Sequence, residues 1–350
     1  MQNTTDVSED FLEYALNHQF GEVHCKVDPA TGMKAIIAIH NTKLGPALGG
    51  CRFIEYAHSN QAILDAMRLA RGMSFKSALA GLPLGGGKAV IIKPKTTFDR
   101  TAYFHAFGKF VNELNGQYIT ALDSGTELTD MDIIAQHTPY VASLTQEDGD
   151  PARATTRGVL RGIQAAVAFQ LKRDDLTGLT IAIQGLGHVG SLLAQYLHEM
   201  GVKLIVADVN AQRAEHIKNR YGAQIMPSED IHKVPCDVFS PCALGAIIND
   251  VSIPQFQTRI IAGAANNQLA HAYHGQMLQE KGILYAPDYV INSGGVIFAC
   301  GKYFHSSPEK VQDNIDHISQ SLNMIFTRSQ QENKSTSDIA DRMAEEILRG

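Results

Sequence analysis

Residues 179–190 read LTIAIQGLGHVG, and this stretch decides the fold of the second half of the chain. An apolar run typical of a buried strand leads into the pattern Gly185-x-Gly187-x-x-Gly190, and an amphipathic helical pattern follows. The next apolar run, 203–207, ends at Asp208, where a Rossmann site carries its acidic residue. This order of strand, glycine turn, helix and carboxylate predicts a Rossmann-type dinucleotide-binding domain, and a glycine-rich turn in another α/β fold is the alternative.

The glycine pattern also predicts how a dinucleotide would bind. The first glycine makes the tight turn, the second lets the backbone approach the pyrophosphate, and the third allows close packing of helix on strand. The carboxylate of Asp208 would bind the adenosine ribose and disfavour a 2′-phosphate, so we predict NAD rather than NADP, although Arg213 is near enough in sequence to accept a phosphate. The expected cofactor contacts here are Gly185, Leu186, Gly187, His188, Val189, Gly190 and Asp208.

Strand-like and helix-like segments alternate on both sides of this stretch, which indicates an α/β protein. Further apolar runs at 237–240, 259–262 and 282–286 suit a parallel sheet. In the first half, strand candidates at 33–40, 44–54 and 118–126 alternate with amphipathic helices at 61–73 and 101–114. A polar stretch at 145–153 separates the halves. We therefore predict an N-terminal α/β substrate and catalytic domain at 1–148 and a Rossmann domain at 149–330, with a C-terminal helix at about 331–350 that packs back on the first domain.

A second landmark is GLPLGGGKAVII at 81–92, where three glycines lead to Lys88 and a Val/Ile run. Glycine permits unusual backbone angles and lets another molecule come close to the chain. A lysine held on such a turn beside an apolar strand would be partly desolvated, which suits acid–base chemistry. A solvated lysine on a tight turn explains the stretch equally well. The spacing does not match a P-loop, which would need glycine at Leu82 and Ser or Thr at Ala89.

The bulk composition describes an ordinary globular protein. The chain has 350 residues, 44% hydrophobic and 19% charged, which suits two domains. A net charge of −6 with scattered acidic residues predicts neither a nucleic-acid nor a membrane surface. Five cysteines without close pairs and a polar N-terminus predict free thiols and a cytoplasmic location. No metal motif is apparent, and we expect His271 and His274 to be exposed helix residues.

Eight stretches carry a resemblance to a known family: LGPALGG (44–50), LARGMSFK (69–76), LPLGGGKAVI (82–91), YITALDSGT (118–126), IAIQGLGHVG (181–190), FSPCALGAIIND (239–250), IAGAANNQL (261–269) and YAPDYVINSGG (285–295). With them the chain resembles the Glu/Leu/Phe/Val dehydrogenase family, most closely its leucine dehydrogenases. The resemblance implies two domains with a cleft between them, usually in an oligomer. It also implies reversible oxidative deamination, in which an L-amino acid, NAD⁺ and water give a 2-oxo acid, ammonium and NADH.

The resemblance assigns roles to matching residues. Lys76 would pair with the substrate α-carboxylate, Lys88 would polarise the carbonyl oxygen and activate water, and Asp123 would exchange protons with the amino group. Taken alone, Asp123 is more often a turn-forming aspartate. Asn267 and Asn292 would lie near the nicotinamide or the substrate. The further cofactor contacts would be Thr155, Cys242, Ala243 and Asn267, and the further substrate contacts Leu48, Gly49, Ala121, Val296 and Ala299.

Substrate identity within the family follows less directly. The pocket candidates carry no charge, which argues against glutamate, although plain core packing explains them as well. Ser124 replaces a usual valine, Ala299 is smaller than the usual branched residue, and Asn266 resembles relatives that act on aromatic substrates. We predict leucine, with valine and isoleucine also accepted. The alternatives are phenylalanine or tryptophan, a catalytically inactive NAD-binding regulatory protein, and a hydroxy-acid oxidoreductase. The partners would be the small substrate and further copies of the chain, as a dimer or an octamer.

Overall fold

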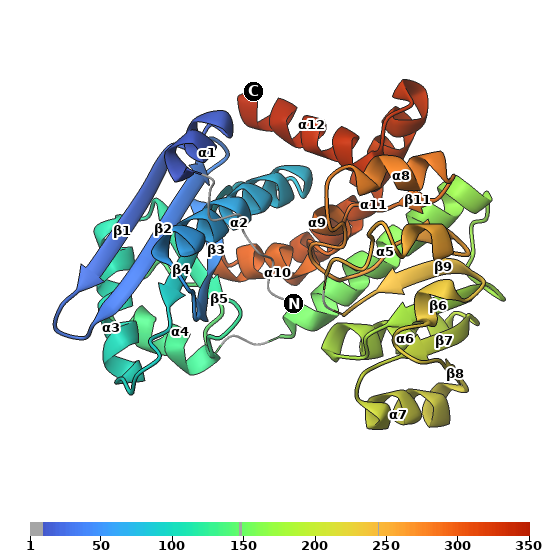
Figure 1. Ribbon diagram of the computed structural model, residues 1–350, viewed down its shortest axis with the longest axis horizontal. Coiled ribbons are helices and arrows are strands. Elements are labelled where there is room, and N and C mark those ends of the chain that lie inside the picture. The colour runs from blue at the N-terminus through green and yellow to red at the C-terminus, as the bar shows by residue number, and fades with distance from the viewer. Residues whose placement is uncertain (1–9, 147–148, 244) are drawn as a thin grey trace. The chain divides into compact units, whose positions relative to one another are not determined.

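The computed structural model describes residues 10–146, 149–243 and 245–350. The chain divides into two compact units, which Figure 1 shows with the colours of the chain order. The first unit is Met1–Gly149 with Ala299–Ser306 and Glu346–Gly350, and the second is Asp150–Phe298 with Ser307–Glu345. Together they form an α/β fold, as the sequence predicts.

The first unit contains a mixed five-stranded sheet in the order β1-β2-β4-β3-β5. Strand β3 is parallel to both β4 and β5, whereas β2 is antiparallel to β1 and β4. The sequence did not predict β1, because its half-exposed edge position leaves a partly polar sequence, EVHCKVD, with weak alternation. The strands are β1 (Glu22–Asp28), β2 (Met33–Asn41), β3 (Ala47–Ile54), β4 (Gly85–Ile92) and β5 (Tyr118–Leu122).

Helices cover both faces of this sheet, because alternate residues of its inner strands are buried on opposite sides. On one face, Ile36 and Val90 pack with residues of α2 such as Leu64. On the other face, Ile37 and Ile91 pack with aromatic residues of α3 and with α4. Both faces are therefore apolar, which explains the nearly continuous hydrophobic runs of β2 and β4. The helices are α1 (Phe11–Asn17), α2 (Ser59–Leu79), α3 (Arg100–Glu113) and α4 (Leu128–Ala135).

The three glycines before Lys88 are the first residues of β4, so the predicted turn is wrong. A Cβ on Gly85 would lie 1.9 Å from the carbonyl oxygen of Asn41, and one on Gly86 would lie 2.0 Å from the backbone nitrogen of Ser74. The glycines therefore allow β4 to approach its neighbours inside the protein. They do not leave room for another molecule, and they place Lys88 in mid-strand.

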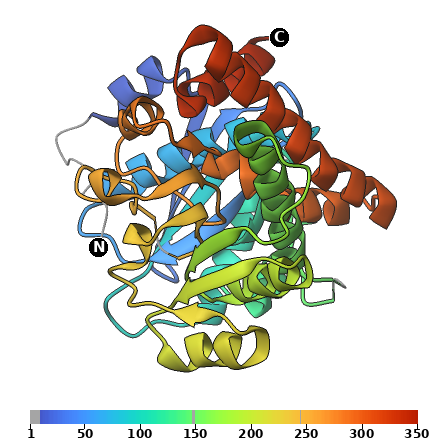
Figure 2. The ribbon, with the colours of Figure 1, turned by 90° about the vertical axis from the view of Figure 1, so that its right-hand side faces the viewer.

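The second unit contains a six-stranded parallel sheet in the order β11-β10-β9-β6-β7-β8, which is the predicted Rossmann-type arrangement. Figure 2 turns this unit toward the viewer, with α11 in red beside α5 in green. Its strands are β6 (Thr180–Gln184), β7 (Lys203–Ala207), β8 (Gln224–Ile225), β9 (Cys236–Pro241), β10 (Thr258–Ile261) and β11 (Leu284–Tyr285). The main helices are α5 (Pro151–Leu171), α6 (His188–Glu199), α7 (Ala211–Tyr221), α8 (His274–Glu280), α9 (Asp288–Ile291) and α11 (Pro308–Glu332).

The C-terminal segment belongs mainly to the second unit. Helix α12 (Thr336–Arg349) begins there, where the Thr336 hydroxyl donates to the Tyr285 carbonyl at 2.7 Å. Of this segment, Glu346–Gly350 are grouped with the first unit. Helix α10 (Gly294–Tyr303) also contributes residues to both units. No helix among the described residues has the length and apolar character needed to cross a membrane.

We predict that Gly86→Ala destabilises the protein by about 2 kcal/mol or more, because the new methyl group would overlap the backbone of α2 at Ser74. Gly72→Ala is the matched control. Gly72 lies inside α2, and a Cβ there would meet nothing within 4 Å, so alanine should stabilise by up to about 1 kcal/mol. Urea denaturation of both variants measures the difference, and equal stabilities would contradict the close-packing role of Gly86.

Candidate active site

A buried lysine–aspartate pair lies in the first unit. Lys88 is on β4 and is 6% exposed, and its Nζ lies 2.7 Å from Oδ2 of Asp123, which follows β5. The backbone N–H of Asp123 donates to the Thr126 hydroxyl at 2.9 Å. A Cβ on Gly50 of β3 would lie only 2.7 Å from the Cβ of Asp123, so that glycine is needed for the close approach. Three neighbouring strands thus hold the ammonium and the carboxylate together.

The electrostatics of the pair favour ionised groups. Burial alone would raise the pKa of the Asp123 carboxyl, but the Lys88 ammonium and the Arg52 guanidinium outweigh it and hold that pKa below its usual range. Asp123 is therefore a carboxylate at neutral pH. A buried ammonium and a carboxylate in contact provide a proton donor and a proton acceptor within hydrogen-bonding reach of one small molecule.

Sequence reasoning missed a third member of this site, Arg52 of β3. Its Nε lies 3.4 Å from Oδ2 of Asp123, and its Nη1 lies 2.9 Å from Oδ2 of Asp65 on α2. The hydroxyl of Tyr56 donates to the same Asp65 oxygen. One signal was present: an arginine between Cys51 and Phe53 in a buried strand needs a charged partner.

The predicted substrate residues of the first unit lie on neighbouring elements. Lys76 is half-buried in the last turn of α2, and Ala299 is half-buried in α10. Leu48 and Gly49 of β3 lie beside β5, where Ala121 is buried. A Cβ on Gly49 would lie 1.8 Å from the carbonyl oxygen of Gly87, so strand packing already accounts for this glycine.

The glycine turn of the second unit has the geometry of a dinucleotide site. Gly185 has a φ of +95°, which favours glycine, and its N–H donates to the Ala207 carbonyl at 2.7 Å. A Cβ on Gly190 would lie 2.0 Å from the Gly185 carbonyl oxygen, so α6 and the turn are in close contact. A Cβ on Gly187, the N-cap of α6, would meet nothing within 4 Å. The open space at this helix N-terminus fits a pyrophosphate.

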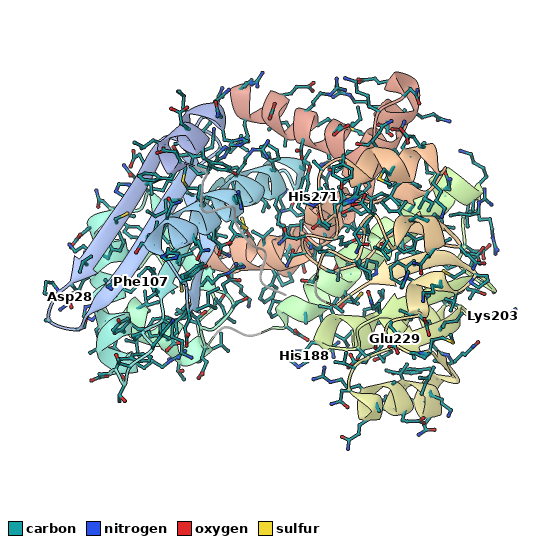
Figure 3. All side chains as sticks on the ribbon, in the orientation of Figure 1. Asp28, Phe107, His188, Lys203, Glu229 and His271 are labelled. Carbon is teal, nitrogen blue, oxygen red and sulfur yellow. The ribbon has the colours of Figure 1, made fainter. Side chains whose placement is uncertain are left out.

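The carboxylate of Asp208 hydrogen-bonds to the backbone on both sides of itself in the sequence and so stabilises this turn. Its Oδ2 accepts the backbone N–H of Leu186 at 2.6 Å, and its Oδ1 accepts that of Asn210 at 2.7 Å. The sequence predicted only a ribose contact for this carboxylate. His188, labelled in Figure 3, is exposed at the start of α6, and Val189 is half-buried.

The other predicted residues of the second unit lie in loops and at helix ends. Asn292 is 7% exposed, and its Nδ2 donates to the Ala264 carbonyl at 3.1 Å and to Oδ1 of Asn266 at 2.7 Å. Its Oδ1 is buried without a hydrogen-bond partner among the described residues, so it fits an N–H donor such as a nicotinamide carboxamide. Asn267 is exposed with a φ of +52°.

Four further candidates of this unit are at least partly accessible. Thr155 donates to the Pro151 carbonyl at 2.9 Å within the first turn of α5. The backbone N–H of Cys242 donates to the Gln184 carbonyl at 2.7 Å, which ties the end of β9 to the end of β6. Ala243 is exposed and Val296 is half-buried.

The prediction for His274 is wrong. Its side chain is fully buried at the start of α8, where Nδ1 accepts the backbone N–H of His271 at 2.9 Å. Its Nε2 lies 3.3 Å from Oδ1 of Asp250. The sequence could not show this burial, because it depends on how the chain before α8 folds onto the His274 ring. His271 is exposed as expected, just before the helix (Figure 3). Among the described residues, no three His, Cys, Asp or Glu side chains gather to hold a metal.

Asp123→Asn should destabilise the protein at pH 7 by about 3 kcal/mol, because it leaves the Lys88 ammonium buried without its counterion. The depressed pKa of Asp123 means that its carboxylate stabilises the fold above the ordinary carboxyl range, and that this stabilisation is lost as the pH falls through the folded-state pKa. The difference in the free energy of unfolding between the wild-type protein and Asp123→Asn should therefore become smaller as the pH falls. Denaturant titrations from pH 7 downward measure it, and a gap that is constant with pH would contradict the ion pair.

Comparisons with known proteins give matches along most of the chain. Residues 18–140 match a family model described as the Glu/Leu/Phe/Val dehydrogenase dimerisation domain, and residues 206–345 match the Glutamate/Leucine/Phenylalanine/Valine dehydrogenase model. Residues 154–242 also match the NAD-binding domain of D-isomer specific 2-hydroxyacid dehydrogenases.

Three relatives illustrate the range of substrates. A leucine dehydrogenase of Geobacillus stearothermophilus is 46% identical over 97% of this chain and 93% of its own. A phenylalanine dehydrogenase of Thermoactinomyces intermedius is 41% identical over 92% of this chain and 89% of its own. The crystal structure of L-tryptophan dehydrogenase from Nostoc punctiforme superposes with a TM-score of 0.88 at 41% identity, over 97% of this chain and 98% of that one.

Proposed function

The chain belongs to the Glu/Leu/Phe/Val dehydrogenase family and is an amino acid dehydrogenase, and from this premise we propose that it oxidatively deaminates branched-chain L-amino acids with NAD. The reaction is reversible: L-leucine, NAD⁺ and water give 4-methyl-2-oxopentanoate, ammonium, NADH and a proton. The observation that supports it most directly is the buried contact between the Lys88 ammonium and the Asp123 carboxylate.

The proposed chemistry divides among three side chains. The Lys76 ammonium pairs with the substrate α-carboxylate and fixes its orientation. Asp123 accepts a proton from the substrate ammonium group, so that the nitrogen lone pair can assist loss of hydride from Cα. NAD⁺ supplies the hydride acceptor when it is bound. The substrate is then an iminium ion, which water attacks at carbon.

Lys88 and Asp123 then complete the hydrolysis. Asp123 first releases the substrate proton to solvent and is again a carboxylate when water attacks. Lys88 stabilises the oxygen of that water and of the resulting carbinolamine, while Asp123 takes one proton from the water and passes it to the nitrogen. The C–N bond then breaks as the carbonyl forms, and the hydroxyl proton leaves with ammonia as ammonium. The contact with Lys88 in the free protein keeps Asp123 a carboxylate until the substrate arrives, because the ammonium lowers the pKa of that carboxyl. The walls of buried apolar residues around β3 and β5 would exclude bulk water from the intermediate.

NAD specificity rests on Asp208. Its carboxylate sits at the glycine turn, where a 2′-phosphate would meet a like charge. We expect kcat/KM with NAD to exceed that with NADP by about 100-fold, since close like charges cost several kcal/mol. Asp208→Asn should narrow the ratio by improving NADP turnover, whereas Arg213→Gln on α7 should leave NAD turnover unchanged. Equal rates with both cofactors in the wild-type protein would refute the role of Asp208.

The preference for branched substrates rests on the uncharged pocket candidates Leu48, Ala121, Val296 and Ala299, together with the resemblance to leucine dehydrogenases. An aromatic substrate is the second candidate, favoured by the similarity to the tryptophan and phenylalanine enzymes and by the small side chain of Ala299. A regulatory protein without activity would not need the Lys88–Asp123 pair.

The test is reductive amination with NADH, ammonium and a panel of branched, aromatic and acidic 2-oxo acids. We expect the highest kcat/KM with the branched acids, and a preference for 2-oxoglutarate would overturn the uncharged pocket. Lys88→Ala is the control: turnover should fall at least about 10³-fold while NADH still binds. Activity that survives this substitution would exclude Lys88 as a catalytic residue.

We further propose that the protein works as a homo-oligomer in the cytoplasm. The matched dimerisation-domain model supports self-association of the first unit. Five free cysteines, four of them half-buried or fully buried, suit a reducing compartment.

A further inference from the structure

Two cations approach the same oxygen of Asp123. The Lys88 ammonium lies 2.7 Å from Oδ2 and the Arg52 Nε lies 3.4 Å from it. The proposed reaction gives these cations different tasks. Lys88 must turn to the oxygen of water and of the carbinolamine, and it then no longer neutralises Asp123 fully. The carboxylate needs another counterion at that stage, or burial would favour its neutral form.

Arg52 is held in a position where its guanidinium can supply the positive charge that Asp123 needs. Its Nη1 lies 2.9 Å from Oδ2 of Asp65, and the Tyr56 hydroxyl donates to the same oxygen. The side chains of Arg52, Asp65 and Asp123 are all between 21% and 23% exposed, so bulk water screens the contacts only partly. A guanidinium fixed by a second carboxylate cannot swing toward the substrate as a flexible lysine can.

The other ionisable groups around Asp123 do not take this role. Burial raises the pKa of the Cys51 thiol to about 12, so it stays neutral. Asp130 is buried and paired with Arg100 of α3 at 2.6 Å. Within the described residues, Lys88 and Arg52 are the two cations in ion pairs with Asp123. The ionisable groups that interact with Asp123 itself are Cys51 and Arg52 on β3, Lys88 on β4 and Tyr118 on β5. Asp65 on α2 and Tyr56 after β3 form the next layer, around Arg52, and Asp130 on α4 acts on Cys51.

We propose that Arg52 is a positioning residue, which holds Asp123 as the charged proton acceptor while Lys88 engages the substrate oxygen. Asp65 and Tyr56 keep its guanidinium in place. No bond to the substrate is required of Arg52, because it acts through Asp123. This inference rests on the proposed function for the roles of Lys88 and Asp123, but the contacts that carry it lie wholly within the first unit.

The first test is the pH dependence of oxidative deamination in Arg52→Met and Arg52→Lys. Arg52→Met should move the acidic limb of kcat to higher pH by about one unit, since it removes a neighbouring positive charge. The limb of kcat/KM should move less, because Lys88 still contacts Asp123 in the free enzyme. Arg52→Lys keeps the charge and should restore most of the wild-type profile. An unmoved kcat limb in Arg52→Met would overturn the proposal.

The Asp65→Asn substitution should shift the acidic limb of kcat in the opposite direction from Arg52→Met. The asparagine Oδ1 can still accept the Arg52 N–H and hold the guanidinium, but the negative charge that offsets Arg52 is gone, so the acidic limb of kcat should move to lower pH. General damage to the fold would not shift the two variants in opposite directions. Arg100→Met is the matched control, because it breaks another arginine–carboxylate pair of the same unit without touching Asp123. It should lower stability and leave the pH profile unchanged, and a shift equal to that of Arg52→Met would also overturn the proposal.

A direct titration separates this inference from the proposed function. ¹³C NMR of the Asp123 carboxyl, assigned by its loss in Asp123→Asn, needs no turnover. Its midpoint should be higher in Arg52→Met and lower in Asp65→Asn than in the wild-type protein. If no amino acid is oxidised, the proposed function fails while this titration still decides whether Arg52 holds the charge of Asp123. If Arg52→Met does not fold, Arg52→Gln and Asp65→Asn provide the same comparison, and unmoved midpoints in both would refute the role.

Discussion

The close approach of strands β3, β4 and β5 is the constraint on which the first unit depends. Glycines at the contact points let the backbones pass where any side chain would overlap a neighbouring carbonyl, nitrogen or ring. That approach brings a lysine from β4 and an aspartate from the end of β5 to 2.7 Å. Helix α2 comes equally close at Ser74, two residues before Lys76. The packing of the strands and the geometry of the charged site are therefore linked. The glycines that let the strands come close together also set the distance between Lys88 and Asp123.

The charges of this site form a compensated group. Lys88 and Arg52 carry two positive charges, and Asp123 and Asp65 carry two negative ones. A balanced cluster avoids the large cost of an isolated buried ion, but it gains little stability beyond that. Such a cluster suits acid–base work, because moving one proton or one side chain changes the field at every other member. The presence of four ionisable groups in mutual contact beside the buried apolar strands is consistent with a functional role.

In the second unit, side-chain hydrogen bonds fix the glycine turn at residues 185–190. The Asp208 carboxylate accepts two backbone N–H groups and so fixes the start of α6 relative to β7. One aspartate thus holds the glycine turn in place, and in the proposed function it also discriminates between the two cofactors. The Oδ1 of Asn292 is buried without a hydrogen-bond partner in the part of the chain that the structure describes, in contrast to the hydrogen-bonded carboxylate of Asp208.

The sequence by itself determined the fold class, the Rossmann-type order of the second unit and the identity of Lys88 and Asp123 as a candidate pair. The first two follow from local patterns, since hydrophobic periodicity and glycine spacing act over a few residues. Lys88 and Asp123 are candidates through the resemblance to the Glu/Leu/Phe/Val dehydrogenase family. Only the tertiary structure decided that the glycine run is strand, that β1 pairs at the sheet edge and that His274 is buried. It also decided that Arg52, 71 positions before Asp123, shares that carboxylate with Lys88. Contacts between residues so far apart depend on how strands and helices pack, and no single stretch of sequence encodes them.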